Sequence, residues 1–510
     1  MKALFRAAGT RPEIPALVLL FVLALTTRLD FLFVEQFARG ADGYYYAAQV
    51  KHFLERGGLF GSDSSLILRW LILFTYITPG ADIIASNKIA IAVLGALLVP
   101  AAFLLGRNLS AGTNPGNTAV NNALGLVLAA FFTSVSPAVW FHLEFVKNLG
   151  GIVLFTLFAA LLFPALDGKR FAVIAAAICL VLTLLSHKLM GGFALIFAAA
   201  GMALAGAKAL HARSARVFRL LVAGSAGLLL VLLLLGVLFP GVLALADFSR
   251  FENLFTWPPR FHVTNYFHFI NPPATHRLEF YIMALAPLPL LFMFAVDALR
   301  RRLSPAWFAS ALFFLMFVIC MNPVLEFRGL DFSFRLLITI FVPAGALLVL
   351  PAARLPGRAA AWGGYLLVLC LAAYQMSAFR AFPIRAKVDY SLYDKVVPLL
   401  VLPRGSLLIA HQSLDNFYYY QEGEDAFRFM PEAKHFNRPV FRLAWGVSTK
   451  DIRRWMPRDA RPRFLPGRYL LLREKDWERF MNRLPPARRR VYRNWKNPHR
   501  FRPGFMRGTK

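Results

Sequence analysis

The sequence predicts a polytopic α-helical membrane protein with about eleven transmembrane helices and a small C-terminal α/β extramembrane domain. Of its 510 residues, 58% are hydrophobic and 16% are charged, whereas a soluble domain has about 45–50% apolar and ~25% charged residues. The apolar residues form blocks of about 20, the helix length that crosses a ~30 Å hydrocarbon layer. After residue 380 these blocks give way to short segments of alternating character.

Eleven apolar segments are expected to span the membrane: 14–34, 83–105, 119–138, 150–166, 171–186, 189–207, 218–240, 278–297, 305–322, 334–351 and 360–378. Lys2, Arg6 and Arg11 before the first segment resemble a signal peptide, but no small-residue cleavage site follows, so an uncleaved first span is expected. The apolar stretch Leu66–Ile77 is too short to cross and contains Arg69, which favours an interfacial or re-entrant helix.

The loops that would face the cytoplasm are short and rich in Lys and Arg, as the positive-inside rule requires. The prediction is therefore a multi-pass protein of the cytoplasmic (inner) membrane with its N-terminus in the cytoplasm. Residues 1–380 form the membrane domain, with a first outer loop over 35–82 and a long outer loop over 241–277. The C-terminal domain is then periplasmic or extracellular.

The C-terminal domain is expected over 381–484. Strands are predicted at 406–411, 440–445 and 469–473, and helices at 414–421, 449–455 and 475–484, an alternation typical of a small α/β domain. Residues 485–510 form a basic aromatic tail without acidic residues. Either a membrane-surface anchor or a poorly ordered terminus fits that composition.

The net charge of +30 would suit nucleic acid in a soluble protein. Here much of the charge lies in short loops between spans, so anionic membrane lipids and phosphate-bearing lipids are the expected partners, and nucleic acid is not. The three cysteines all lie within apolar runs, which excludes a disulfide framework or a metal–thiolate cluster.

An acidic, tyrosine-rich segment follows the first span, and its first helical face carries Asp42, Tyr45, Tyr46, Gln49 and Phe53. A carboxylate beside aromatic hydroxyls at a membrane rim suits deprotonation of an acceptor hydroxyl while the rings stack on a sugar. Asp42 precedes Gly43 and a helical run that ends at Gly57, so a helix N-cap is the structural alternative.

Five further residues near span ends are candidates. Glu144 and Lys147 open the fourth span, where a local ion pair would also explain them. His187 and Lys188 end the fifth span, and Arg335 opens the tenth. Snorkelling alone places basic residues at such depths, but the phosphate of a lipid substrate lies there too and pairs with Arg and Lys.

The long outer loop contains His262, His268 and His276 at intervals of six and eight residues, which match no common metal-site spacing. We expect His262 and His268 to contact a substrate headgroup rather than a metal. No cofactor is indicated with certainty, and a divalent metal remains open.

The Asp42 loop, the Glu144 turn and the Arg335 span resemble the GT-C superfamily, membrane glycosyltransferases that use polyprenyl-phosphate-linked sugars. The resemblance implies an enzyme that moves a sugar to an acceptor hydroxyl at the outer face, with inversion. It implies Asp42 as the general base, Glu144 as a second acidic position, and Lys188, Arg335 and His187 as donor-phosphate ligands. Tyr45, Tyr46, Gln49 and Lys147 would then bind substrate.

The Trp-Trp-Asp signature of oligosaccharyltransferases and the His-Pro-Pro of protein mannosyltransferase relatives are absent. The acceptor, whether lipid, glycan or protein, therefore stays open. Two other functions fit the same pattern: a transporter or flippase of lipid-linked saccharides, and a non-catalytic membrane scaffold.

Overall fold

The computed structural model describes residues 13–40, 42–59, 65–143, 145–211, 274–299, 306–321, 335–355, 357–381, 390–411, 413–423, 426–427 and 438–493. The chain forms two compact units. The first, here called the helical unit, combines residues 1–34, 61–78 and 88–382. The second, the mixed unit, combines residues 35–60, 79–87 and 383–510.

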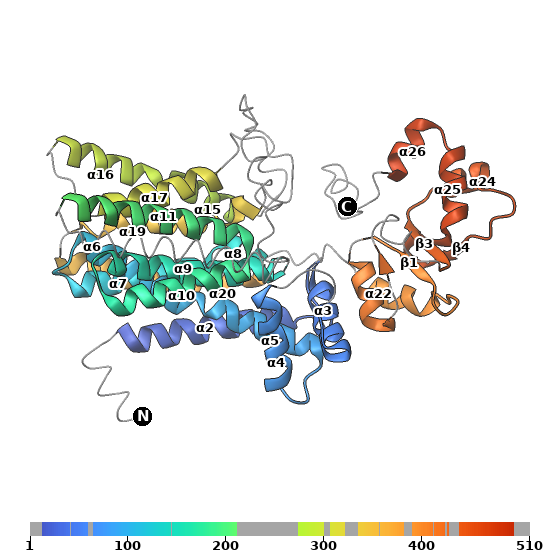
Figure 1. The fold of residues 1–510 in the computed structure, drawn as a ribbon, viewed down its shortest axis with the longest axis horizontal. Helices are drawn as coiled ribbons and strands as arrows, with labels where there is room; N and C mark the ends of the chain where they lie inside the picture. The colour runs from blue at the N-terminus through green and yellow to red at the C-terminus, as the bar shows by residue number, and fades with distance from the viewer. Residues whose placement is uncertain are drawn as a thin grey trace. The chain divides into compact units, whose positions relative to one another are not determined.

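The helical unit is built from helices that run side by side in Figure 1. They are α2 (Glu13–Phe33), α4 (Leu66–Ile77), most of α5 (Ile83–Ala96), α6 (Leu98–Thr113), α7 (Thr118–Ser134), α8 (Ser136–Leu143), α9 (Val146–Leu166), α10 (Arg170–Ser186), α11 (Lys188–His211), α15 (Ala274–Leu285), α16 (Pro287–Leu299), α17 (Ala306–Cys320), α19 (Phe341–Ala352) and α20 (Gly357–Ala381).

Within the described residues, six helical segments are long and apolar enough to cross a membrane: Glu13–Phe33, Ile83–Thr113, Val146–Leu166, Lys188–Ala207, Arg335–Ala352 and Ala360–Ser377. Shorter apolar helices occupy Thr118–Ser134, Arg170–Ser186, Leu278–Met293 and Trp307–Cys320. Ten of the eleven expected spans thus coincide with described helices, and 218–240 lies outside the described residues. The expected short helix at Leu66–Ile77 is α4.

Small residues set the closest packing in this unit. A Cβ added at Gly106 of α6 would lie 2.9 Å from the carbonyl oxygen of Leu124, and one at Gly125 of α7 would lie 2.8 Å from that of Phe103. The two helices therefore touch backbone to backbone, as small residues allow in membrane bundles.

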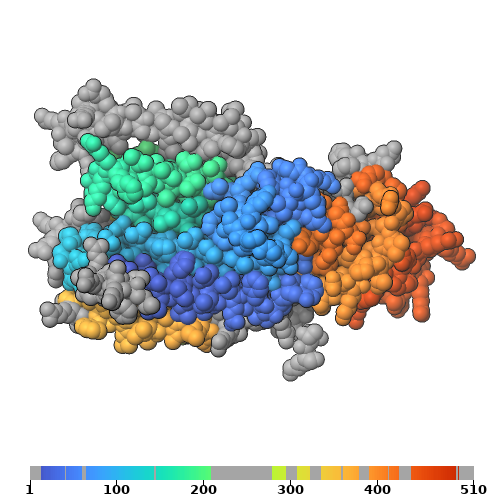
Figure 2. All heavy atoms as spheres, turned by 90° about the horizontal axis from the view of Figure 1, so that it is seen from below, coloured from blue at the N-terminus to red at the C-terminus, as the bar shows by residue number. Residues whose placement is uncertain are grey.

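The outer surface of the bundle is apolar. Leu19 on α2 is 69% exposed, and Phe171 on α10 is 81% exposed. Figure 2 shows α2, in dark blue, along one face of this unit. Large apolar side chains on the outside of a helix bundle are typical of a surface that faces the lipid of a membrane. This is a multi-pass membrane protein.

The mixed unit is centred on one sheet of five strands with the order β2-β1-β3-β5-β4. β1 (Leu407–Ile409) pairs in parallel with β2 (Ala426–Phe427) and with β3 (Val440–Trp445). β5 (Tyr469–Arg473) pairs antiparallel with β3 and with β4 (Arg463–Leu465). The three predicted strands are β1, β3 and β5, whereas β2 and β4 are short strands that the prediction missed.

Helices cover both faces of this sheet. The other elements are α3 (Gly43–Arg56), α21 (Tyr390–Val396), η2 (Val397–Leu399), α22 (Leu414–Glu422), α24 (Thr449–Trp455), η3 (Pro466–Arg468), α25 (Glu474–Arg483) and α26 (Pro486–Arg493). Leu443 and Leu471 belong to a core with residues of α3, α21 and α22. Their neighbours Ala444 and Leu470 belong to a second core with residues of α24 and α25, since successive strand residues point to opposite faces.

Candidate functional site

Four basic side chains come together in the helical unit. Lys147 lies in the first turn of α9, His187 joins α10 to α11, Lys188 begins α11, and Arg335 begins the segment Arg335–Ala352. The charges of Arg335, Lys147 and Lys188 all act on the His187 ring. We call these four residues the basic cluster. It brings together four positions that the sequence singled out separately.

A glycine makes room for this arrangement. A Cβ at Gly151 of α9 would lie 2.8 Å from the Cβ of His187, so only glycine lets α9 approach the α10–α11 junction this closely. Asn148 lies one turn before Gly151 and therefore on the same side of α9.

Three buried nitrogens at these positions have no hydrogen-bond partner: Nε of Arg335, Nδ1 of His187 and Nδ2 of Asn148. The guanidinium carbon of Arg335 lies 4.7 Å from the ring centroid of Phe145, which orients the group without satisfying its Nε–H. More than about 90% of buried polar groups in proteins are hydrogen-bonded. Partnerless nitrogens beside the charges of Arg335, Lys147 and Lys188 are compatible with an anion that accepts several hydrogen bonds.

Asp42 lies in the mixed unit, directly before α3. The helix does end with the expected glycine, since Gly57 adopts φ +72°. At the other end the Asp42 carboxylate makes no capping hydrogen bond. The backbone of Asp42 (φ −97°, ψ 1°) lies in the bridge region, where many active-site residues are found. The N-cap explanation of this carboxylate is thus not supported by a hydrogen bond.

The aromatic residues that follow Asp42 differ in burial. Tyr46 is 3% exposed and Gln49 is 1% exposed, whereas Tyr45 is half-buried. Tyr45 and Tyr46 form an edge contact with ring centroids 5.4 Å apart. Of these three side chains, only that of Tyr45 is partly accessible to a ligand.

The Asp42 segment packs on the C-terminal part of the mixed unit. The Tyr44 ring lies 4.6 Å from that of Tyr390, 4.7 Å from that of Phe417 and 5.3 Å from that of Tyr420. Lys51 Nζ donates to the carbonyl oxygen of Tyr420 at 2.6 Å. Burial, followed by the nearby charge of Asp82, raises the pKa of the Tyr420 hydroxyl to about 12. The Tyr420 hydroxyl therefore stays neutral at physiological pH.

The helical unit also contains two buried cations that the sequence did not place in the candidate site. Arg28 on α2 is fully buried and donates from Nε to Nε2 of His142 at 2.8 Å and from Nη2 to the Thr133 carbonyl at 3.3 Å. Lys88 on α5 is 4% exposed, with Nζ 5.1 Å from the ring centroid of Phe33. Both residues are charged and lie within apolar segments of the sequence, a pattern that indicates a position inside the bundle or in a functional site.

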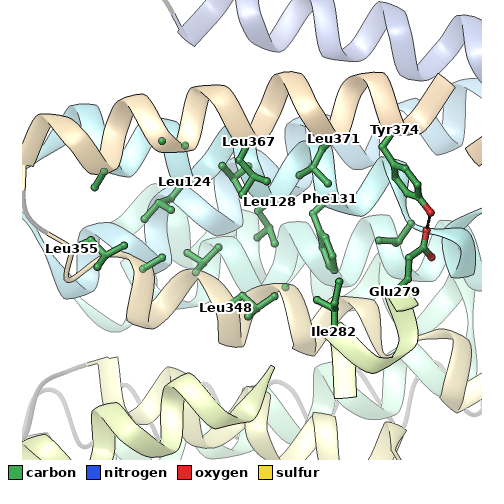
Figure 3. A pocket seen from close by; sticks show the side chains of 18 of the residues that line it. Leu124, Leu128, Phe131, Glu279, Ile282, Leu348, Leu355, Leu367, Leu371 and Tyr374 are labelled. Atoms are coloured by element: carbon green, nitrogen blue, oxygen red, sulfur yellow. Dashed lines mark hydrogen bonds between the residues drawn. The ribbon is translucent and has the colours of Figure 1, made fainter. Parts of the chain in front are cut away.

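An apolar pocket of about 880 Å³ lies between α7, α15, α19 and α20 (Figure 3). Apart from Glu279 and Tyr374, every residue that lines it is apolar or glycine. At its polar end the Glu279 carboxylate accepts hydrogen bonds from the Ser136 amide at 2.8 Å, the Ser136 hydroxyl at 2.5 Å and the Tyr374 hydroxyl.

Three predicted site residues, Glu144, His262 and His268, lie outside the described residues. Among the residues that are described, no group of three His, Cys, Asp or Glu side chains is arranged to hold a metal ion.

Comparison with known proteins gives a likeness of fold. No protein-family model and no curated protein sequence matches the chain. Among solved structures, ArnT from Cupriavidus metallidurans in the apo state aligns over 89% of this chain and 97% of its own, with 13% identity and a TM-score of 0.51. The chain therefore shares the fold of this ArnT structure, and the helical membrane architecture with a small C-terminal sheet domain that the sequence predicted is confirmed.

Proposed function

We propose that this protein is a membrane glycosyltransferase that moves a sugar from a polyprenyl-phosphate donor to an acceptor hydroxyl at the outer face of the cytoplasmic membrane. The observation that carries the proposal is the basic cluster with its partnerless nitrogens on Arg335, His187 and Asn148. The cluster has positive charge and nitrogens without hydrogen-bond partners. A lipid phosphate at the end of a membrane helix would supply both negative charge and several acceptor oxygens.

In the proposed reaction the acceptor oxygen attacks the anomeric carbon from the face opposite the phosphate. A new carbon–oxygen bond forms there as the bond to the phosphate oxygen breaks, so the configuration inverts. Asp42 takes the proton of the acceptor hydroxyl, and the phosphate leaves with the electron pair of the broken bond. Arg335, Lys188 and His187 stabilise the charge that develops on that phosphate.

Two features support Asp42 as the base. Its carboxylate does not serve as a hydrogen-bonded N-cap of α3, and the half-buried ring of Tyr45 is close in sequence for stacking on a sugar. Glu144, Tyr46, Gln49, Lys147, His262 and His268 remain candidates for substrate contacts. The acceptor can be a lipid, a glycan or a protein.

Substitution of Asp42 tests the proposal. In membranes that contain the protein, release of undecaprenyl phosphate from a panel of undecaprenyl-phosphate-linked hexoses and pentoses measures transfer. Asp42→Asn is expected to lower the rate about 10²–10⁴-fold, the usual contribution of a general base, while binding of undecaprenyl phosphate itself stays unchanged. Retention of most of the rate in Asp42→Asn would remove Asp42 from the mechanism.

Asp82→Asn is the matched control. Asp82 is also an acid at a helix start in the mixed unit, but its Oδ1 accepts the Ala85 amide at 2.6 Å. Asn keeps a side-chain oxygen that can accept the same amide, so this variant should keep both its stability and its rate.

The proposal also places the mixed unit on the outer face. Short basic loops support this orientation, and the contacts of Tyr44 and Lys51 with α22 put Asp42 and the C-terminal region on one side. A cysteine at Val401, which is 73% exposed, should react with an impermeant maleimide in intact spheroplasts. Ser413 is fully buried and unsuitable as a label site. Reaction only after permeabilisation would reverse the orientation.

A further inference from the structure

Tyr390, the first residue of α21, contacts the segment that carries Asp42. Its hydroxyl donates to the carbonyl oxygen of Gly40 at 2.7 Å. Its ring lies against those of Tyr44, at 4.6 Å, and Phe417, at 5.8 Å between centroids. The side chain is 3% exposed, so the hydrogen bond is shielded from competing water.

Gly40 is the turning point of the Asp42 loop. It adopts φ +76°, which only glycine enters without strain. Its carbonyl also accepts the Gly43 amide at 3.4 Å, and the Asp42 carbonyl accepts the Tyr46 amide at 3.2 Å. The backbone hydrogen bonds of Gly40 and Asp42 are otherwise made to neighbouring residues of the same segment. The Tyr390 hydroxyl adds a hydrogen bond from a distant part of the chain.

Tyr390 is oriented in turn by Ser413, whose side chain hydrogen-bonds to it. Ser413 is fully buried and adopts φ +79° at the turn between β1 and α22. A non-glycine residue in this conformation is strained and persists only where its surroundings determine it. Burial first, and then the charges of Tyr44 and Asp42, hold the pKa of Tyr390 well above its ordinary value. The hydroxyl therefore keeps its proton and remains a donor at physiological pH.

We propose that Tyr390, oriented by Ser413, is a positioning residue for Asp42: it fixes the Gly40 carbonyl and thereby the placement of the carboxylate. The C-terminal region then has a direct part in catalysis, because it determines where the proton acceptor lies. This inference rests on the proposed role of Asp42. A displacement of about 1 Å in a catalytic group can cost about 100-fold in rate.

The first measurement is hydrogen exchange of the intact wild-type and variant proteins in detergent, which needs no substrate. Tyr390→Phe keeps the ring and removes the hydroxyl. Loss of one buried hydrogen bond should make amides of the 40–46 segment exchange about two- to tenfold faster. Tyr393→Phe is the matched control, because Tyr393 is a buried tyrosine of the same helix whose hydroxyl bonds to Tyr469. It should leave the 40–46 segment unchanged.

The second measurement is transfer from the undecaprenyl-phosphate sugar panel. Tyr390→Phe should lower kcat about tenfold or more, leave KM for the donor unchanged and add nothing in the Asp42→Asn background, since both substitutions act on one group. Ser413→Gly relieves the positive φ, preserves the turn and removes the orienting hydroxyl. It should show the same signature with a smaller loss.

The outcomes separate the two hypotheses. If Asp42→Asn keeps its activity, the proposed base is wrong, whatever the exchange data show. If Asp42→Asn is inactive while Tyr390→Phe exchanges and turns over like wild type, the positioning role is overturned. Equal effects of Tyr390→Phe and Tyr393→Phe on the 40–46 segment would also overturn it, because they would reflect general loosening of α21.

Discussion

Two polar sites in the helical unit differ in how fully their hydrogen bonds are made. Glu279 accepts three hydrogen bonds, two from Ser136 and one from Tyr374. At the basic cluster, Arg335 and His187 each retain a buried nitrogen without a partner. A satisfied polar group in a bundle holds helices together, whereas an unsatisfied one costs free energy until a ligand arrives. The difference agrees with a structural role for the first site and with the ligand-binding role proposed for the second.

Arg335→Ala is expected to give the largest effect that separates the sites. It removes a charge-assisted donor, so affinity for undecaprenyl phosphate should fall by about 1.5–3 kcal/mol, or roughly 10–150-fold. The melting temperature should hold or rise, because the variant also removes a partnerless buried group. Binding by detergent-solubilised protein can be followed by calorimetry.

Lys188→Ala is the companion to the Arg335 variant and should have a smaller effect. The Lys188 side chain is exposed, and exposed charges contribute about 0.2–1 kcal/mol, so its loss should be below about fivefold. Unchanged affinity in both variants would reduce these residues to snorkelling cations.

Glu279→Ala should show the opposite pattern with a smaller effect. Three donors on Ser136 and Tyr374 lose their acceptor, which should cost about 1–2 kcal/mol of stability and leave affinity for undecaprenyl phosphate as it was. Thermal unfolding monitored by tryptophan fluorescence measures the first quantity. A variant that melts like wild type but binds the lipid phosphate more weakly would place the ligand at Glu279 and break the comparison.

The regular elements were largely predictable because apolar block length and alternation are local signals. The helix Leu66–Ile77 and the strands Val440–Trp445 and Tyr469–Arg473 begin and end where the sequence predicted. β2 and β4 have two and three residues. Such segments are too short to show the alternation of apolar and polar residues by which a strand is recognised in a sequence. Their pairing depends on neighbours in the sheet rather than on their own residues.

The candidate sites were predictable in residue type but not in environment. Basic residues at span ends singled out His187 and Arg335, yet no pattern shows that their nitrogens lack partners. The hydrogen bond from Tyr390 to Gly40 joins residues 350 positions apart, and single-sequence periodicity carries no information on such pairs. Arg28 was likewise visible as a charge within an apolar run, whereas its bond to His142, 114 residues later, was not.

The bond from Lys51 to Tyr420 has a consequence for biosynthesis. Its two residues are separated by 369 positions, and ribosomes add about 5–20 residues per second. The Asp42 loop therefore waits roughly 20–75 s after its own synthesis before the surface of α22 emerges. During that interval the nascent chain has inserted most of its helices but has not received the contacts that order its acidic loop. Chains that terminate early would reach the membrane with that loop unsupported by α22.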